Sequence, residues 1–99
     1  MRFDACAVYI LANLNRSVLY VGVTSDLVTR VAAHRKRLEP SSFTARYRVD
    51  RLVHFDAFED ITVAIQREKQ LKGWSRAKKL RLIERDNPSW EDLWDSLAS

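Results

Sequence analysis

Two apolar runs near the N-terminus, separated by a short polar segment, predict a β-hairpin. Two runs rich in β-branched and aromatic residues, Ala5–Ala12 and Ser17–Val23, flank the polar segment 13–16, where asparagine favours a turn. A loop of either two or four residues pairs positions whose numbers sum to 29, which places Tyr9 directly opposite Tyr20. Opposed residues point to the same face of a sheet, so the two phenols are expected to share a face.

Further along the chain, the pattern predicts one more strand and four helices. The strand is the alternating run Arg51–Phe58, in which His54 has no expected chemical role. Capping residues place the helix starts near Asp26, Asp60, Ser75 and Ser89, with the second helix ending at Gly73 and the last covering about 89–98. The segment 39–50 is expected to be a loop. The expected fold class is therefore α/β (α+β), a three-stranded antiparallel sheet flanked by helices.

Each helix has an apolar stripe that is expected to face the core. The stripes are Leu27, Val31 and Leu38 in the first helix, Ile61, Ala64, Ile65 and Leu71 in the second, Leu80 and Ile83 in the third, and Trp90, Leu93, Trp94 and Leu97 in the last. Glu68 interrupts the second stripe, three residues from both Ile65 and Leu71. A carboxylate there is costly unless it pairs with a cation or a metal ion, and the pattern leaves both open.

Length and composition fit one globular domain, 1–99, with a core of about 5–85. Of the 99 residues 46% are hydrophobic and 30% charged, which is typical of a folded soluble chain. The longest apolar run has eight residues and is too short to cross a membrane. Asp4 lies where a signal peptide carries positive charge, and the single Cys6 has no partner for an internal disulfide. A cytoplasmic location is expected.

The charges are unevenly distributed along the chain. Residues 30–51 contain seven Lys or Arg and two acids, and residues 67–85 contain eight against two. By contrast, residues 86–99 contain four acids and no Lys or Arg. With a net charge of +4, a basic body with an acidic tail indicates a polyanionic partner, most simply nucleic acid. An ordinary solvated surface explains the charge equally well.

The stretch from Tyr20 to Arg37 combines three groups suited to phosphodiester chemistry. Tyr20 lies in the second strand, and Arg30 and His34 follow on a helix, four residues apart and so on one face. A phenol, a guanidinium and an imidazole near one strand-to-helix corner suit attack on a phosphodiester, although surface helices also carry such residues. In segment 39–50, aromatic residues alternate with arginines, which suits base stacking and phosphate contacts or simply anchors the loop.

Five positions in order along the chain resemble the signature of the GIY-YIG nuclease superfamily. They are the tyrosines of the triplets Ala7-Val8-Tyr9 and Tyr20-Val21-Gly22, which ten residues separate, followed by Arg30, His34 and Glu68. Phe43-Thr44 and segment 66–72 also resemble its small single-domain bacterial members, which are related to the N-terminal nuclease domain of excinuclease subunits. The resemblance covers about residues 6–85. Ala7 replaces the usual glycine, and only Asn87 is available for the asparagine that many members place after the metal-binding glutamate.

The resemblance implies a metal-dependent endonuclease that hydrolyses phosphodiester bonds, in DNA rather than RNA. Glu68 is then the ligand of one Mg²⁺ or Mn²⁺ ion, and Arg30 binds the non-bridging phosphate oxygens. Tyr20 is favoured as the base or the residue that positions water, with Tyr9 as its hydrogen-bonding partner and His34 in support or as the base itself. Further nucleic-acid contacts are expected from Arg35, Arg46, Tyr47, Lys69, Lys72, Lys78 and Lys79.

Two other functions are compatible with the sequence. One is a non-catalytic nucleic-acid-binding module on the same scaffold. The other is a protein-interaction domain that uses Trp90 and Trp94 of the last helix. The preferred nucleic-acid structure and any sequence specificity have no signal in the sequence, and a monomer or weak homodimer is expected.

Overall fold

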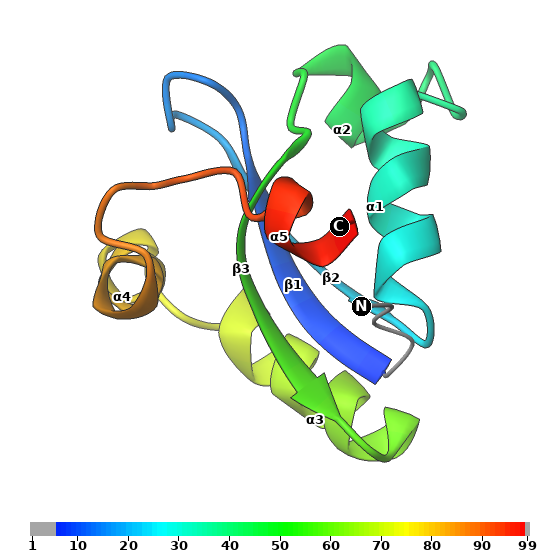
Figure 1. The fold of residues 1–99 in the computed structure, drawn as a ribbon. Helices are drawn as coiled ribbons and strands as arrows, with labels where there is room; N and C mark the ends of the chain where they lie inside the picture. The colour runs from blue at the N-terminus through cyan, green and yellow to red at the C-terminus, as the bar shows by residue number, and fades with distance from the viewer. Residues whose placement is uncertain (1–5, 99) are drawn as a thin grey trace.

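A three-stranded antiparallel sheet lies between two groups of helices in the computed structural model, which describes residues 6–98 (Figure 1). The strands are β1 Cys6–Ala12, β2 Leu19–Thr24 and β3 Arg51–Phe58. The helices are α1 Leu27–Lys36, α2 Phe43–Arg46, α3 Ile61–Lys72, α4 Arg76–Asp86 and α5 Trp94–Ala98. The predicted fold class is confirmed, and β3 has its predicted bounds, whereas Ala5 lies outside the described residues. None of the helices within 6–98 has the length and apolar character needed to span a membrane.

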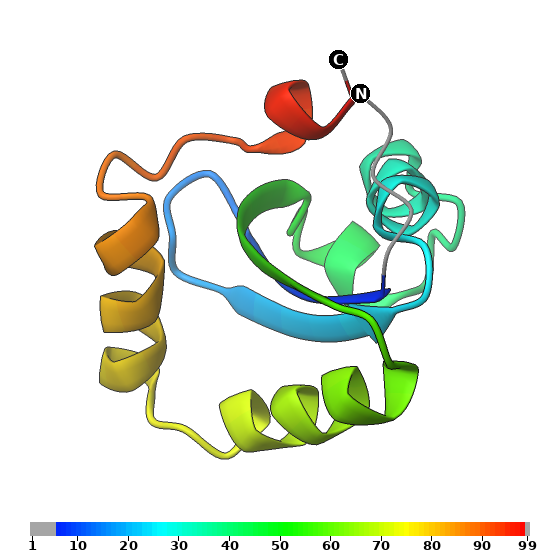
Figure 2. The same cartoon turned by 60° about the horizontal axis from the view of Figure 1, so that its bottom comes forward.

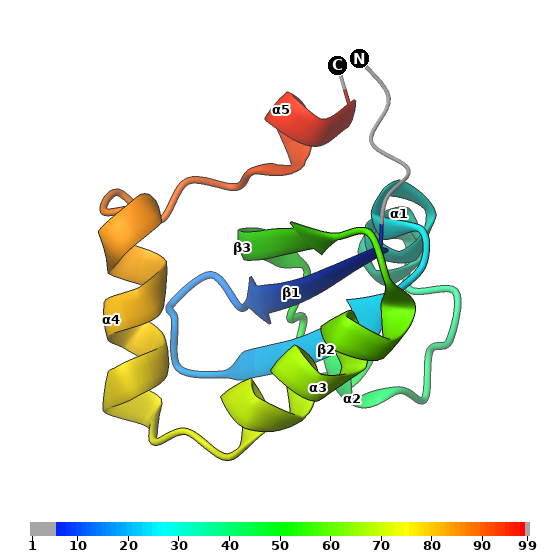
Figure 3. The ribbon, with the colours of Figure 1, turned by 90° about the horizontal axis from the view of Figure 1, so that it is seen from below.

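The central strand β1 lies between β2 and β3 and is buried on both faces, because helices cover both sides of the sheet. Its even-numbered residues pack with side chains from α3 and α4, and its odd-numbered residues pack with side chains from α1 and α5. Figure 2 shows α3 on one side of the sheet and α1 and α5 on the other. The helix α3 lies along β2 and β1 (Figure 3). This alternation is what a strand covered by helices on both faces requires.

The β1–β2 hairpin has a register two residues away from the predicted one. Tyr9 lies opposite Gly22 rather than Tyr20, and paired numbers sum to 31. The wider turn is held by Asn13, whose backbone N–H donates to the carbonyl of Val18 and whose side-chain oxygen accepts the N–H of Val18. A shift of two residues keeps every side chain on its face. Tyr9 and Tyr20 therefore share a face as predicted, but as diagonal neighbours.

A β-bulge interrupts the pairing of β3 with β1. The register shifts after Ile10, and Val53 is the extra residue on β3. Val53 and His54 therefore both point toward the side of the sheet that α4 covers. The His54 imidazole is buried there, with one nitrogen 3.1 Å from the Asp56 carboxylate and the other 3.9 Å from that of Asp86. His54 thus lies on the face of the sheet opposite to Tyr9.

Three of the four predicted helix starts are confirmed by their caps. The side chains of Asp26, Asp60 and Ser75 each accept a backbone N–H from the first turn of the following helix. The first helix ends earlier than its apolar stripe suggests, because Arg37 adopts a left-handed conformation with φ 52°. Leu38, expected in the core, is consequently 64% exposed.

Two other expectations about the helices are wrong. The segment 39–50, expected to be a loop, contains the short helix α2, which the Ser42 side chain caps by accepting the N–H of Ala45. On α3, Ala64 and Leu71 are buried as expected, but Ile61 and Ile65 are each 38% exposed. The helix therefore presents a narrower face to the sheet than its apolar residues suggest.

The C-terminal helix begins at Trp94 rather than near Ser89. The reason is Asp92, whose Oδ1 accepts the N–H of Leu52 at 3.2 Å and that of Trp94 at 3.1 Å. Asp92 thereby caps α5 and ties the segment before it to β3. Trp90 has φ 55° and packs in the core beneath α3 and α4, whereas Trp94 packs on the α1 side. The predicted tryptophan stripe is thus divided between the two faces of the sheet, and no helix presents both rings to a partner.

Candidate active site

Tyr9 crosses β2 at Gly22, which lies opposite it in the register. A Cβ atom added at Gly22 would lie 2.4 Å from both Cζ and the hydroxyl oxygen of Tyr9, a distance at which non-bonded atoms clash. The Tyr9 side chain is 0% exposed. Glycine at this position therefore allows the central strand to carry a phenol across its neighbour toward the outer edge of the sheet.

His34 of α1 is the hydrogen-bonding partner of that phenol. Its Nε2 lies 3.0 Å from the Tyr9 hydroxyl, and its Nδ1 lies 2.9 Å from the hydroxyl of Thr44. Thr44 is a buried residue of α2, and its hydroxyl is also 3.3 Å from that of Ser42. The segment expected to be a loop thus fixes the orientation of the imidazole. The Tyr9 hydrogen bond goes to His34, whereas Tyr20 was the expected partner.

Burial keeps both Tyr9 and His34 neutral near pH 7. Burial raises the pKa of Tyr9 well above its ordinary value, with Tyr20 adding to the rise and Arg30 opposing it. Burial also lowers the pKa of His34 below 6.5, and the positive charge of Arg30 lowers it further. A neutral imidazole has one N–H, and a neutral phenol has one proton to donate. Donation from Tyr9 to Nε2, and from Nδ1–H to Thr44, satisfies all three groups.

Tyr20 and Arg30 lie beside this pair. The Tyr20 ring centroid is 5.5 Å from that of His34 and 6.3 Å from that of Tyr9. Tyr20 is half-buried, so it is the phenol that solvent can reach. Arg30 is exposed one helical turn before His34. A groove of about 390 Å³ runs along this side of α1, and Arg30, His34 and Thr44 are among the residues that line it.

Glu68 approaches the same edge of the sheet from α3. Its charge is near enough to Tyr9 to add to the rise in the pKa of that phenol. The Glu68 side chain is 15% exposed, and its Oε2 lies 3.1 Å from the ammonium of Lys72, one turn later on α3. The Lys72 side chain is 53% exposed. Glu68 therefore has a cationic partner, but that partner is a lysine in contact with solvent rather than a buried arginine.

The chemistry of Glu68 fits a metal ion that is shared with a substrate. No group of three His, Cys, Asp or Glu side chains in the described part of the chain is placed to hold a metal ion. Mg²⁺ in phosphate-processing sites commonly keeps several waters and is held by one or two carboxylates together with substrate phosphates. One carboxylate near Tyr9 meets that minimal requirement, and the assignment of Glu68 as the metal ligand stays a prediction.

Six of the seven side chains expected to contact nucleic acid lie on α2, α3 and α4 or at their ends. Arg46 and Tyr47 are exposed at the end of α2, with the guanidinium 5.8 Å from the centre of the phenol ring. The lysines of α3, Lys69 and Lys72, are exposed near Glu68. Lys78 and Lys79 lie on α4, where Lys78 is exposed and Lys79 is half-buried. All six roles stay predictions.

Arg35, the seventh, already has partners within the protein. Its guanidinium lies 2.6 Å from the Asp92 carboxylate and 3.4 Å from the backbone carbonyl of Asp50, and 5.3 Å from the centre of the Trp94 ring. These contacts hold the C-terminal segment against α1. Arg35 would therefore contact a phosphate only through the guanidinium N–H groups that these partners leave free.

Sequence reasoning missed the roles of Gly22 and Thr44. Gly22 belongs to the second triplet and Thr44 to the pair Phe43-Thr44, and both segments resemble the family. This resemblance was the signal that could have identified them.

Asn87 lies outside the cluster. Its carboxamide is buried, donates to the carbonyls of Val53 and Glu91 and accepts the N–H of Glu91. Asn87 therefore joins β3 to the segment after α4.

Comparison with known proteins agrees with this geometry. Residues 5–81 match the GIY-YIG catalytic domain. A UPF0213 protein of Natronomonas pharaonis is 38% identical over 76 residues, which cover 77% of this chain and 87% of that protein. Similar UPF0213 proteins occur in Syntrophus aciditrophicus, 35% identical over 82% of this chain and 91% of the relative, and in Staphylococcus aureus, 36% identical over 81% and 95%. No solved structure gives a significant match. The match covers most of the chain, and the fold and side chains described above agree with it. This chain is therefore a member of the GIY-YIG nuclease family.

Proposed function

We propose that the protein is a metal-dependent endonuclease that hydrolyses phosphodiester bonds in DNA. The observation that carries the proposal is the cluster at the β2 edge, where the Tyr9–His34–Thr44 hydrogen bonds lie beside Tyr20 and Arg30. Family membership supports nucleic acid as the substrate. A packed core would not need a neutral histidine with both nitrogens bonded beside an exposed arginine.

Within this mechanism, Tyr20 orients or deprotonates the attacking water. Both ring nitrogens of His34 are engaged by Tyr9 and Thr44, so His34 acts as a positioning residue for the two phenols. Tyr20 lies against the same imidazole and is half-buried, which leaves its hydroxyl as the group within reach of substrate. Arg30 donates to the non-bridging oxygens, where a guanidinium fork matches the geometry of a phosphate.

Glu68 would hold one Mg²⁺ or Mn²⁺ ion, which when bound neutralises charge on the phosphate and assists departure of the leaving oxygen. The carboxylate would leave Lys72 for the metal at little cost, because the lysine is more than half exposed and stays solvated. Metal binding without nucleic acid should be weak, because the chain offers a single carboxylate and the remaining ligands are water and phosphate.

A nicking assay on supercoiled plasmid and on branched DNA tests the proposed function. The protein with Mg²⁺ or Mn²⁺ should convert supercoiled plasmid to the nicked form, and a chelator should stop the reaction. Tyr20→Phe should lower kcat by about 100-fold or more, as expected for removal of a general base. Tyr47→Phe removes a phenol hydroxyl that lies outside the cluster. Because Tyr47 is a predicted nucleic-acid contact, its loss should raise KM, with kcat changed less than about tenfold.

Two outcomes would contradict the proposal. Binding of DNA with no cleavage of any form, in any of these metals, would identify the non-catalytic binding module instead. Equal kcat values for Tyr20→Phe and the unmodified protein would remove Tyr20 from the mechanism.

A further inference from the structure

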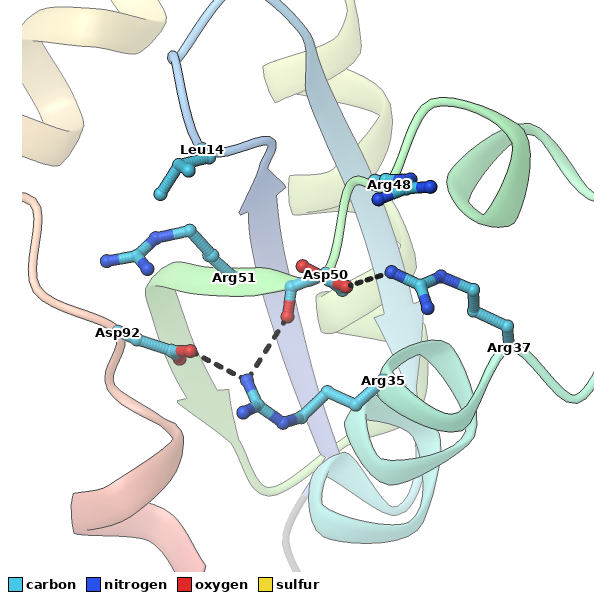
Figure 4. A pocket seen from close by; sticks show the side chains of 7 residues that line it. All are labelled: Leu14, Arg35, Arg37, Arg48, Asp50, Arg51 and Asp92. Carbon is cyan, nitrogen blue, oxygen red and sulfur yellow. Dashed lines mark hydrogen bonds and ion pairs between the residues drawn. The ribbon is translucent and has the colours of Figure 1, made fainter.

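A second basic site lies at the end of the sheet, where α1 finishes and β3 begins. It is a pocket of about 360 Å³ (Figure 4). Its lining consists of Leu14, Arg35, Arg37, Arg48, Asp50, Arg51 and Asp92, and these residues define the arginine pocket. Four guanidinium groups and two carboxylates leave an excess of two positive charges. None of the five residues assigned to catalysis lines it.

The two carboxylates fix two of the arginines and leave the other two free. Arg35 pairs with Asp92 at 2.6 Å, and Arg37 pairs with Asp50 at 3.2 Å. Within residues 6–98, the guanidinium groups of Arg48 and Arg51 form no hydrogen bond or ion pair. Guanidinium groups gathered in one place repel one another unless anions compensate them. The pocket is thus short of negative charge by two units, the amount that two phosphodiester groups provide.

At two of these positions the backbone adopts a left-handed conformation, which favours glycine. Arg37 and Arg48 have φ values of 52° and 54°, and each follows the end of a helix. At α1, the N–H groups of Arg37 and Leu38 donate to the carbonyls of His34 and Ala33. The end of α2 repeats this pattern of hydrogen bonds, with Arg48 in the place of Arg37. Glycine is the usual residue at this left-handed position, because a side chain there is strained. Both helix ends instead direct an arginine into the same pocket.

The arginine pocket and the groove at the candidate active site share one lining residue, Arg37. Arg30, His34 and Arg37 are four and then three residues apart, which places them along one side of α1. Arg37 lines both the arginine pocket and the groove that contains Arg30 and His34. Seven residues of helix advance about 10 Å, which corresponds to about three nucleotide steps along one strand of a duplex.

We infer that the arginine pocket binds two backbone phosphates of the nucleic acid, about three nucleotides from the phosphodiester held at Arg30. This assignment rests on the proposed function for the identity of the ligand. Arg48 and Arg51 extend to opposite sides of Asp50 (Figure 4), so each contacts its own phosphate, and Asp50 and Asp92 hold the other two guanidinium groups in place. The contact is independent of sequence, because only the backbone reaches the pocket, and it fixes the direction of the strand through the active site.

Binding isotherms at several salt concentrations test this inference. The probe is a short fluorescent DNA duplex of mixed sequence, with a chelator present so that no cleavage occurs. Arg48→Gly removes a guanidinium and relieves the left-handed strain, and Arg51→Gln removes one from a strand. Each should reduce the slope of log affinity against log salt by about 0.9 and weaken binding about eightfold near 0.1 M salt. Arg48→Gly should also melt at the same temperature as the unmodified protein or higher.

Arg16→Gly is the matched control. Arg16 is also left-handed, with φ 64°, but its guanidinium stacks on Trp90 at 4.9 Å and does not line the arginine pocket. The variant loses the same charge and gains the same glycine, so its slope should match that of the unmodified protein. A slope that falls equally in all three variants would indicate a general charge effect and overturn the assignment.

Unchanged slopes for Arg48→Gly and Arg51→Gln would also overturn it. A large drop in melting temperature for Arg48→Gly would show that its guanidinium serves the helix end instead. These outcomes are separable from failure of the proposed function. If the protein binds DNA but cleaves none, the slopes still decide the role of the arginine pocket, and if it cleaves with unchanged slopes, only the pocket assignment fails.

Discussion

Replacing Glu68 by glutamine separates a metal ligand from a structural ion pair, because the two roles predict opposite results for stability and activity. The carboxylate lies 3.1 Å from an ammonium that is 53% exposed, so its removal leaves Lys72 in water. An ion pair at this helical spacing whose cation is in contact with solvent contributes about 0.3–0.5 kcal/mol. For a domain of this size, such a loss lowers the melting temperature by only about 1–4 °C. Loss of one partner of a buried pair would cost about 3–5 kcal/mol and lower it by at least about 12 °C.

Cleavage by Glu68→Gln should respond far more strongly than stability. A metal ion stabilises the charge of the transition state by several kcal/mol. Loss of its ligand should therefore lower kcat by about 100-fold or more, with little recovery at higher Mg²⁺. Affinity for DNA should be retained or increased, because a negative charge leaves the phosphate site. Lys72→Gln is the matched control, since it breaks the same ion pair and leaves the carboxylate. It should show the same small thermal shift and a higher KM, with kcat changed less than about tenfold.

Thermal melting followed by circular dichroism, together with nicking rates per folded molecule, decides between the two roles. If Glu68→Gln lowers the melting temperature by more than about 10 °C and leaves cleavage intact, Glu68 is not the metal ligand, and its pair with Lys72 is not a weak, solvated one. Equal losses of kcat in Glu68→Gln and Lys72→Gln would show that the ion pair itself, rather than the carboxylate, supports catalysis.

Three further predictions follow from the cluster and the C-terminal segment. Gly22→Ala should displace the Tyr9 ring, destabilise the protein by about 1–3 kcal/mol and reduce cleavage, and an alanine variant that melts and cleaves normally would contradict the close approach of the two strands. The pKa of His34 is lower in the folded than in the unfolded protein, so its contribution to the free energy of unfolding is present above pH 6.5 and is lost as the pH falls below that value. Urea titrations should therefore show that the free energy of unfolding differs less between pH 7.5 and pH 5.5 for His34→Gln than for the unmodified protein. Asp92→Asn should weaken the attachment of α5 by about 1–2 kcal/mol and strengthen DNA binding, because it frees Arg35, and weaker binding would count against the arginine pocket.

The parts of the fold that follow from nearby residues could be predicted from the sequence. The caps at Asp26, Asp60 and Ser75 each involve residues two or three positions apart, and their helices begin where the sequence indicated. The strand β3 was equally clear, because its apolar residues and its boundaries lie within one continuous run. The shared face of Tyr9 and Tyr20 was also correct, since strand geometry alone determines it once the shift in register is even.

The parts that failed depend on residues far apart in the chain. Ser89 has a local capping pattern, but Asp92 also bonds to Leu52, and this distant contact moves the start of the last helix to Trp94. Similarly, no local pattern tells that Thr44 meets the imidazole of His34, because the two residues converge only after the chain has turned at Arg37. For the candidate site, the residue types could be named from a resemblance, but their hydrogen bonds, protonation and access to solvent required the three-dimensional arrangement.

The route of Tyr9 across Gly22 determines how fluctuations reach the site. Its backbone belongs to the central strand, which is hydrogen-bonded on both sides, so its amide should exchange with deuterium only through global unfolding. The four-residue helix that carries Thr44 and the edge strand that carries Tyr20 have fewer such bonds and should exchange earlier. The buried phenol is thereby held in place by the slowest-opening part of the protein, while the segments that carry Tyr20 and Thr44 remain free to open on shorter timescales.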